Sequence, residues 1–322
     1  GRDRPGGRAW SAVGLVGVIA GFIILSYYSV VAGWTLHYIV LALQGQLSEL
    51  ARQPDLLQAH FVQGFLADGP QQILHHLIFM AGTVGAVYFG VQKGIERVAR
   101  VLMPLLFGIL LFLVVYSTTT AGFGDAIGFL FRPNFGDLGA GAVLEALGQA
   151  FFSLSLGMGA MLTYGSYMQR QSSVPRSVVE ICLLDSLMGI LACVIMFSII
   201  FTFDLEITQS ATILFTTLPT VFVQLPLGGF VCGLFFVLVA FAALTSTVSL
   251  MEVVSSFAID TLGWARRRAT LTMGAAIAVF GTLSALSLGG SEGPSGFNLF
   301  GKESTQGVFS SLDYLAANWL LP

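Results

Sequence analysis

Oxygen-bearing side chains interrupt several of the most apolar stretches of this sequence. Asp185 stands inside an apolar run, and Thr245 and Ser246 are adjacent hydroxyls in the segment AALTSTVS. Such hard oxygen donors suit an alkali cation. A carboxylate within a membrane span costs about 2.5 to 3.5 kcal/mol to insert, so its presence there indicates a functional site. These residues therefore predict a cation site. The alternatives are a protonated acid bonded to a neighbouring helix, and hydroxyls that bond back to the preceding turn.

A further apolar segment is interrupted by small and polar residues. The stretch QAFFSLSLGMGAMLTYGSY places Ser153, Ser155, Gly157 and Gly159 where lipid offers no hydrogen bonds to a loosened backbone. A helix broken at that depth must line something polar, and broken helices are typical of ion and substrate sites in secondary transporters. The alternative is that small residues such as these, or the pair Gly17 and Gly21, only let helices pack closely.

The composition is that of a polytopic membrane protein. Only 10% of the residues are charged, 55% are hydrophobic, and the mean hydropathy is +0.84. No nucleotide-binding loop or convincing catalytic constellation is present, which argues against ATP-driven transport and against a membrane enzyme. Neither the four histidines nor the three cysteines show the spacing of a metal or redox motif, and we expect Cys182, Cys193 and Cys232 to be packing residues.

Apolar runs long enough to cross a bilayer predict seven helical spans and the start of an eighth. They cover residues 10–43, 73–91, 101–118, 143–168, 178–203, 229–259 and 271–288, with a partial span beginning near Leu312. We expect the segment FTTLPTVFVQLP to form short helices that dip toward an outer vestibule, or else a plain surface loop. Because the chain neither starts with Met nor completes its last helix, we expect it to be the middle of a longer protein.

Basic residues mark alternate loops. Most of the 14 fall before the first span and in the loops after the second, fourth and sixth, which the positive-inside rule assigns to the cytoplasm. They are Arg2, Arg4, Arg8, Lys93, Arg97, Arg100, Arg170, Arg176, Arg266, Arg267 and Arg268. The pattern predicts a multi-pass protein of the plasma (cytoplasmic) membrane with the Gly1 end on the cytoplasmic side.

The polar groups of four spans fall at one depth. At about 1.5 Å per residue, the centres of three spans lie near Tyr28, Gly157 and Thr245, and Asp185 lies about a dozen ångströms inside a fourth. This coincidence predicts a central site. It also favours a functional reading of the broken stretch over simple packing.

Five segments carry motifs of one family in the family's order. GQAFFSLSLGMGAMLTYGSY resembles the sixth helix of the neurotransmitter:sodium symporter family, FAALTSTVSLMEVV its eighth helix, and SYYSVVAGW its third. KGIERVARVLMP resembles the start of the fifth helix, and FTTLPTVFVQLP the fourth outer loop. The resemblance implies an all-α polytopic protein with the leucine-transporter inverted-repeat fold. Residues 1–322 would be one transmembrane domain holding helices three to nine and the start of ten, without the first two helices or the C-terminal ones.

The resemblance also implies a substrate site. Tyr28 matches the tyrosine that binds the substrate carboxylate, and Phe152 the aromatic that closes a lid with it. Ile24 lies one turn before Tyr28 on the same face and is expected to line the side-chain pocket. The remaining expected substrate-binding residues are Ser153, Ser155, Met158, Ser246 and Leu250.

Two sodium ions are the implied cofactors, and each site is incomplete in this chain. Ser153 and Asp185 would bind the first sodium, and the Ala242 carbonyl with the hydroxyls of Thr245 and Ser246 the second. The resemblance thus implies sodium-coupled amino-acid symport by alternating access, with the lipid bilayer as surroundings, a possible homodimer and no nucleic-acid partner. A non-transporting receptor or regulatory protein on the same fold, or an inactive fragment, is the alternative.

Two departures from the family and one helix-loosening pair suggest details of the mechanism. Gly189 replaces the serine of the chloride site in animal members, and Asp185 brings its own negative charge, so we expect transport without chloride. Met158 replaces a phenylalanine, and its flexible thioether favours a large hydrophobic or aromatic amino acid. Gly94 and Pro104 predict a helix start that unwinds locally, although a static kink is the commoner result of such a pair.

Overall fold

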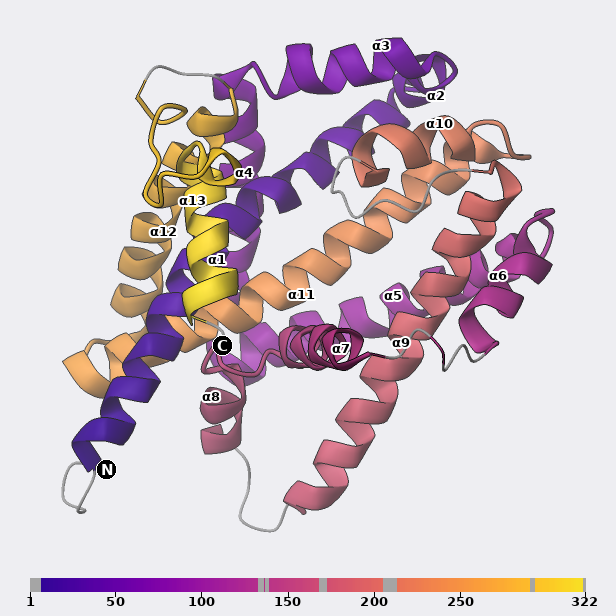
Figure 1. The fold of residues 1–322 in the computed structure, drawn as a ribbon. Coiled ribbons are helices and arrows are strands. Elements are labelled where there is room, and N and C mark those ends of the chain that lie inside the picture. The colour runs from indigo at the N-terminus through magenta and orange to yellow at the C-terminus, as the bar shows by residue number, and fades with distance from the viewer. Residues whose placement is uncertain are drawn as a thin grey trace.

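The protein is described here by a computed structural model, which covers residues 7–132, 136, 139–167, 173–204, 213–289 and 293–320. These residues form helices joined by short turns, with no strand among them. Two long apolar helices, α1 (Gly7–Leu43) and α11 (Gly228–Leu262), lie side by side and run in opposite directions across the molecule (Figure 1). They form the frame on which the other helices pack.

One side of this frame is covered by two helices. α4 (Gly69–Tyr88) and α12 (Arg266–Leu288) pack against α1, α11 and each other. Gly33 of α1 makes the crossing with α4 close, because a Cβ there would lie 2.9 Å from the backbone at His75 and His76. α13 (Val308–Leu315) and the π-helical turn η6 (Ala316–Leu320) add a further layer beside α1 and α12.

The other side is more open. α5 (Glu96–Ser117) follows the π-helical turn η2 (Val91–Ile95) and packs against α11 and α9 (Val174–Thr202), with the short helix α6 (Phe123–Phe131) against α9. α7 (Ala140–Ser153) and α8 (Ala160–Tyr167) are separate helices, with α7 near the centre of Figure 1 and α8 below and to the left of it. Each predicted span therefore corresponds to helix, and five of these helices in the described part of the chain are long and apolar enough to cross a membrane.

Short helices cover the end of the frame that lies opposite the N-terminus. They are α2 (Gln46–Ala51), α3 (Pro54–Ala59), η1 (His60–Phe65), η4 (Ile213–Thr217) and α10 (Leu218–Phe222), with η5 (Glu303–Thr305) before α13. Every residue of α10 is buried. The segment FTTLPTVFVQLP is therefore a pair of packed short helices rather than a surface loop.

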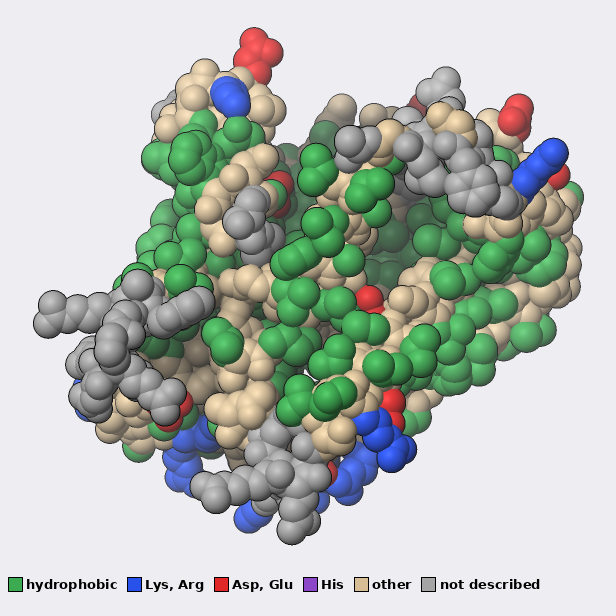
Figure 2. Space-filling view, turned by 60° about the horizontal axis from the view of Figure 1, so that its bottom comes forward, with side chains coloured by type: hydrophobic (Ala, Val, Ile, Leu, Met, Phe, Trp, Pro, Cys, Tyr) green, Lys and Arg blue, Asp and Glu red, His purple; other side chains and the backbone are tan. Residues whose placement is uncertain are grey.

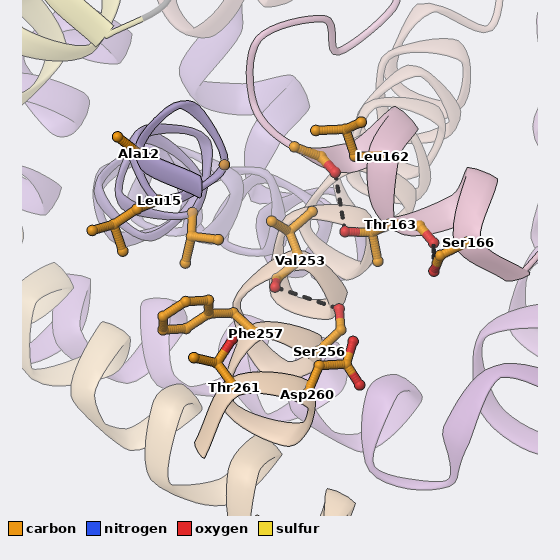
Figure 3. A pocket seen from close by; sticks show the side chains of 13 residues that line it. Ala12, Leu15, Leu162, Thr163, Ser166, Val253, Ser256, Phe257, Asp260 and Thr261 are labelled. Atoms are coloured by element: carbon orange, nitrogen blue, oxygen red, sulfur yellow. Dashed lines mark hydrogen bonds between the residues drawn. The ribbon is translucent and has the colours of Figure 1, made fainter. Parts of the chain in front are cut away.

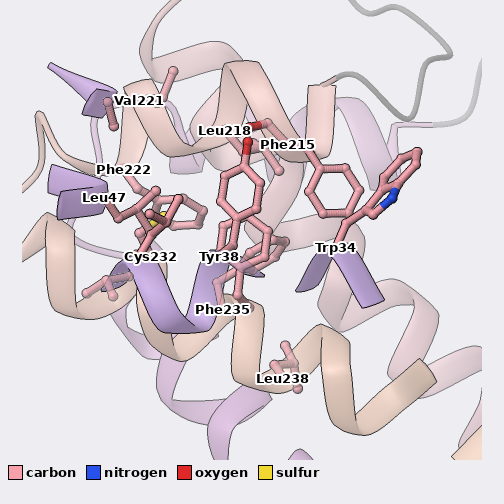
Figure 4. Packing of buried hydrophobic residues seen from close by; sticks show 14 of the residues in the cluster. Trp34, Tyr38, Leu47, Phe215, Leu218, Val221, Phe222, Cys232, Phe235 and Leu238 are labelled. Carbon is pink, nitrogen blue, oxygen red and sulfur yellow. Dashed lines mark hydrogen bonds between the residues drawn. The ribbon is translucent and has the colours of Figure 1, made fainter. Parts of the chain in front are cut away.

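An aromatic core fixes these caps on the frame. Trp34 and Tyr38 of α1 pack against Phe215 of η4, and Tyr38 stacks on Phe236 of α11 (Figure 4). The Tyr38 hydroxyl donates a hydrogen bond to the Phe215 carbonyl, so this buried polar group is satisfied. At the opposite end, Lys and Arg side chains gather along the lower edge of the molecule (Figure 2).

Candidate functional site

The predicted helix break lies between α7 and α8. α7 ends at Ser153, the chain turns from Leu154 to Gly159, and α8 starts at Ala160. Ser155, Gly157 and Gly159 adopt positive φ angles of 53°, 84° and 76°, in the left-handed region that glycine tolerates and serine rarely adopts. The break predicted at Ser153–Gly159 is confirmed, and Ser155 takes part in it with a strained backbone.

Glycine residues of α1 let the broken segment approach. A Cβ at Gly17 would lie 3.2 Å from the Gly157 oxygen and 3.2 Å from the Gly159 nitrogen, and one at Gly21 would lie 3.7 Å from the Met158 oxygen. The close packing expected of Gly17 and Gly21 is therefore found, but its partner is the exposed backbone of the turn. α1 positions the break.

Apolar candidates from three elements meet beside this turn. Ile24 of α1, Met158 of the turn and Leu250 of α11 belong to one buried cluster, with exposed fractions of 3%, 4% and 6%. The half-buried ring of Tyr28 packs against the same cluster. The structure thus brings together four predicted pocket residues. Ile24, Met158 and Leu250 form an apolar wall, and the Tyr28 hydroxyl lies at its edge.

Ser153 and Asp185 are also brought together. The Ser153 Oγ donates to Asp185 Oδ2 at 2.9 Å, which joins the end of α7 to the middle of α9. Asp185 is half-buried and has no ion-pair partner within the described ranges. A carboxylate and a hydroxyl therefore stand together next to the last turn of α7, whose carbonyls at Ala150, Phe151 and Phe152 accept hydrogen bonds from the N–H groups of the following turn.

The three candidates on α11 form a tight local group. The hydroxyls of Thr245 and Ser246 both donate to the Ala242 carbonyl, at 2.8 and 3.2 Å. This back-bonding is the alternative that the sequence left open for these hydroxyls. The same three oxygens lie close enough to face one cation once the hydroxyl protons turn away. Ser246 is exposed and also interacts with the hydroxyl of Tyr28.

Phe152 lies apart from the other predicted substrate-binding residues. Its side chain is 48% exposed on α7, and among the described aromatic residues no ring contact links it to Tyr28. The lid expected of these two residues is therefore not closed in this structure. The role of Phe152 in closing such a lid stays a prediction.

A cavity of about 870 Å³ opens beside the break, between α1, α8 and α11 (Figure 3). Leu15 of α1, Leu162 and Thr163 of α8, and Val253 and Asp260 of α11 are among its lining residues. Thr163 donates to the Gly159 carbonyl at 3.0 Å, so the wall of the cavity reaches the broken segment directly. The cavity extends from the candidate site along the side of the frame where α1 begins.

The ion pair between Glu252 of α11 and Arg266 of α12 was not predicted from the sequence. The main partner of Glu252 is Arg266, whose two terminal nitrogens lie 2.7 and 2.8 Å from the carboxylate. Tyr167 of α8 adds a hydrogen bond of 2.6 Å. Glu252 is fully buried, and a buried carboxylate needs a cation, so the arginine run that follows its helix was the available signal.

The turn before α5 is compact. Gly90 has a φ angle of 84°, and a Cβ at Gly94 would lie only 1.9 Å from the Ala86 oxygen, so glycine is required at Gly94. α5 then continues through Pro104 without interruption. The local unwinding expected here is not present in this conformation apart from the π-helical turn η2.

These features match one protein family. Residues 57–314 match the family described as the sodium:neurotransmitter symporter family. The chain belongs to this family. It is 40% identical over 319 residues to the uncharacterized sodium-dependent transporter YhdH of Bacillus subtilis, and 30% identical over 314 residues to an uncharacterized sodium-dependent transporter of Haemophilus influenzae. These alignments cover 98% and 97% of the chain, and in each case 67% of the relative.

The fold is that of a solved relative. The crystal structure of MhsT in complex with L-phenylalanine superposes with a TM-score of 0.84 at 37% identity, and the match covers 99% of this chain and 70% of MhsT. The predicted family and transporter fold are confirmed. Because the family and the named relatives are transporters, the prediction that the chain is not an enzyme is confirmed too.

Proposed function

We propose that this symporter-family chain contributes the greater part of a sodium-coupled amino-acid importer that works by alternating access and without chloride. The observation that supports this most directly is the broken helix, whose two ends meet an ion-binding pair and an apolar pocket wall. Ser153 at the end of α7 contacts Asp185, and Met158 in the turn packs with Ile24 and Leu250. The end of α7 and the turn that follows it would thereby link sodium binding to substrate binding.

The first sodium would be held by Ser153 and Asp185. The carbonyl end of a half-helix carries a partial negative charge and suits a cation at membrane depth. Asp185 supplies a full negative charge, and Gly189, one turn later on α9, offers no side chain for an anion. A site neutralised by its own carboxylate has no need of chloride.

The second sodium would lie at Ala242, Thr245 and Ser246. Each of the two hydroxyl oxygens already lies within 3.2 Å of the carbonyl oxygen, along one turn of α11. Both hydroxyls can rotate so that their lone pairs face an ion, since a hydroxyl is donor and acceptor at once.

The substrate would be a large hydrophobic or aromatic amino acid. Ile24, Met158 and Leu250 supply an apolar wall, and the Tyr28 hydroxyl supplies a polar group for the carboxylate. Methionine adapts its shape to bulky ligands. MhsT, similar in fold and sequence, was crystallised with L-phenylalanine, which supports this substrate class.

Release would proceed through the cavity beside α8. It reaches from Gly159 toward the edge where basic side chains gather, which we assign to the cytoplasmic side of the plasma membrane. The contact of Tyr167 with the Glu252–Arg266 pair ties α8 to α11 and α12, so α8 would swing only after this contact breaks. Unwinding at Gly94 would open the same side further.

Uptake by the complete protein in proteoliposomes tests the proposal. Labelled tryptophan or leucine should accumulate under an inward sodium gradient, compete with a panel of amino acids, and persist when gluconate replaces chloride. Sodium-dependent binding without uptake would instead support the receptor alternative. Loss of uptake without chloride would contradict the role given to Asp185.

A further inference from the structure

Two histidines that the transport site does not use face each other at the capped end of the frame. Nε2 of His37 in α1 lies 3.2 Å from Nε2 of His60 in η1. The ring centroids are 5.4 Å apart and the ring planes differ by 11°, so the two nitrogens lie at the facing edges of nearly parallel rings. In the metal-free protein one imidazole donates its N–H to the other.

We propose that His37 and His60 form a transition-metal site, of the kind that binds zinc. In tetrahedral zinc sites the bonds to histidine are about 2.0 to 2.1 Å, which places two ligand nitrogens about 3.3 Å apart. The observed separation of 3.2 Å is close to this value. Because the two nitrogens point at each other in the hydrogen bond, the half-buried His60 ring would swing off the line that joins them so that both lone pairs meet at one ion, which takes the place of the shared proton.

The surroundings hold the His37 ring in place. Phe65 stacks on it with centroids 4.0 Å apart and planes 10° apart, and His75 meets it edge-on at 5.3 Å. His37 itself is 5% exposed and cannot turn freely, whereas His60 lies on a short helix at the surface. One ligand is therefore rigid and the other can adjust to the ion.

The site has two protein ligands. Within the described ranges, no group of three or more His, Cys, Asp and Glu side chains is arranged to hold a metal. The third nearby histidine, His75, donates from Nδ1 to the Gln71 carbonyl at 2.8 Å and meets His37 edge-on, outside the facing pair of nitrogens. Water would complete the coordination, which is acceptable because His60 is only half-buried.

The experiment measures zinc binding to the complete purified protein by calorimetry and by the shift in thermal unfolding. We expect saturable binding of zinc alone and none of magnesium, which prefers oxygen ligands. H60Q should weaken zinc binding by at least about tenfold, since even the loss of an outer-shell partner costs that much. H60C should retain binding, because a thiolate replaces the imidazole as a zinc ligand.

A matched control lies on the same short helix. Gln63 is exposed close to His60, and Q63A should leave zinc binding unchanged. Equal zinc affinity in the unmodified protein and H60Q, or the absence of any saturable binding, would overturn the proposal. Because binding is measured directly, the result does not depend on transport. H60Q should also retain sodium-driven uptake without zinc, so failure of uptake in the unmodified protein would count only against the transport proposal.

Discussion

Ser153 at the end of α7 donates a 2.9 Å hydrogen bond to Asp185 in the middle of α9, across 32 residues of sequence. This contact joins the broken helix to the one carboxylate that the sequence had marked as costly in a membrane span. A sodium ion at this point would bind between the two oxygens. The charge of Asp185 would then decide how strongly the ion binds.

D185N tests this charge. The amide keeps the size of the side chain and can still bond Ser153, but it removes the negative charge next to the ion. We expect the sodium concentration for half-maximal uptake to rise by about tenfold or more, which corresponds to about 1.4 kcal/mol of lost binding free energy. An unchanged sodium dependence of uptake would show that Asp185 does not bind the ion.

Thr245→Val tests the second sodium site. Valine has the shape of threonine without the hydroxyl, so the apparent sodium affinity should fall by about tenfold or more, as expected when a charge-binding group worth about 1.5 to 3 kcal/mol is lost. Thr282 is a matched control, because its hydroxyl donates to the Ala278 carbonyl at 2.9 Å in α12, away from the site. T282V should leave sodium dependence unaltered, and equal effects of both variants would argue against a site at Thr245.

G17A tests the contact between α1 and the broken turn. The added methyl group would press on the backbone of Gly157 and Gly159 at 3.2 Å, and backbone cannot move aside as a side chain can. Overpacking of this kind costs about 1 to 3 kcal/mol, so we expect a lower unfolding temperature together with weaker substrate binding. G14A is the control, since a Cβ there meets nothing within 4 Å. Similar losses of unfolding temperature and substrate binding in G17A and G14A would mean that the effect arises within helix α1 and not from its contact with the turn.

R266Q tests the buried ion pair. It leaves the fully buried Glu252 carboxylate without its cation, and breaking such a pair costs about 3 to 5 kcal/mol of unfolding free energy. Y167F removes one hydrogen bond to the charged carboxylate and should cost about 1.5 to 3 kcal/mol. Thermal unfolding in detergent measures both. If the double variant E252Q/R266Q were no more stable than R266Q, the unpaired charge of Glu252 would not be the cause of the lost stability.

Acidification should loosen the cap that carries His60. Burial lowers the pKa of His60 below its ordinary value, so the folded protein favours the neutral ring, which bonds His37. The unfolded chain binds the proton more readily, and the stabilisation present above pH about 6.5 is lost as the pH falls through the folded-state pKa. The difference in unfolding temperature between pH 7.5 and pH 5 should shrink in H60Q. An unaltered difference would assign the pH effect to other groups.

Much of the fold could be read from the sequence because membrane helices obey strong local rules. A span needs about 20 apolar residues, and its backbone must be satisfied within the helix, so the helices and the break at Ser153–Gly159 follow from apolar runs and from serine and glycine placement. The 1.5 Å rise also put Tyr28, Asp185 and Thr245 at one depth. The depth of a residue in the membrane follows from its position along its own helix, so it can be predicted without knowing which helices lie beside it.

Contacts between helices were decided by the tertiary structure. Depth alone could not show that Ser153 meets Asp185, that the turn packs on Gly17, or that Glu252 pairs with Arg266. Nor could it show that Phe152 stays apart from Tyr28. These relations depend on the rotation and crossing angle of each helix, which arise from packing across the whole protein. The sequence determined which residues were available at each level, and packing decided which of them touch.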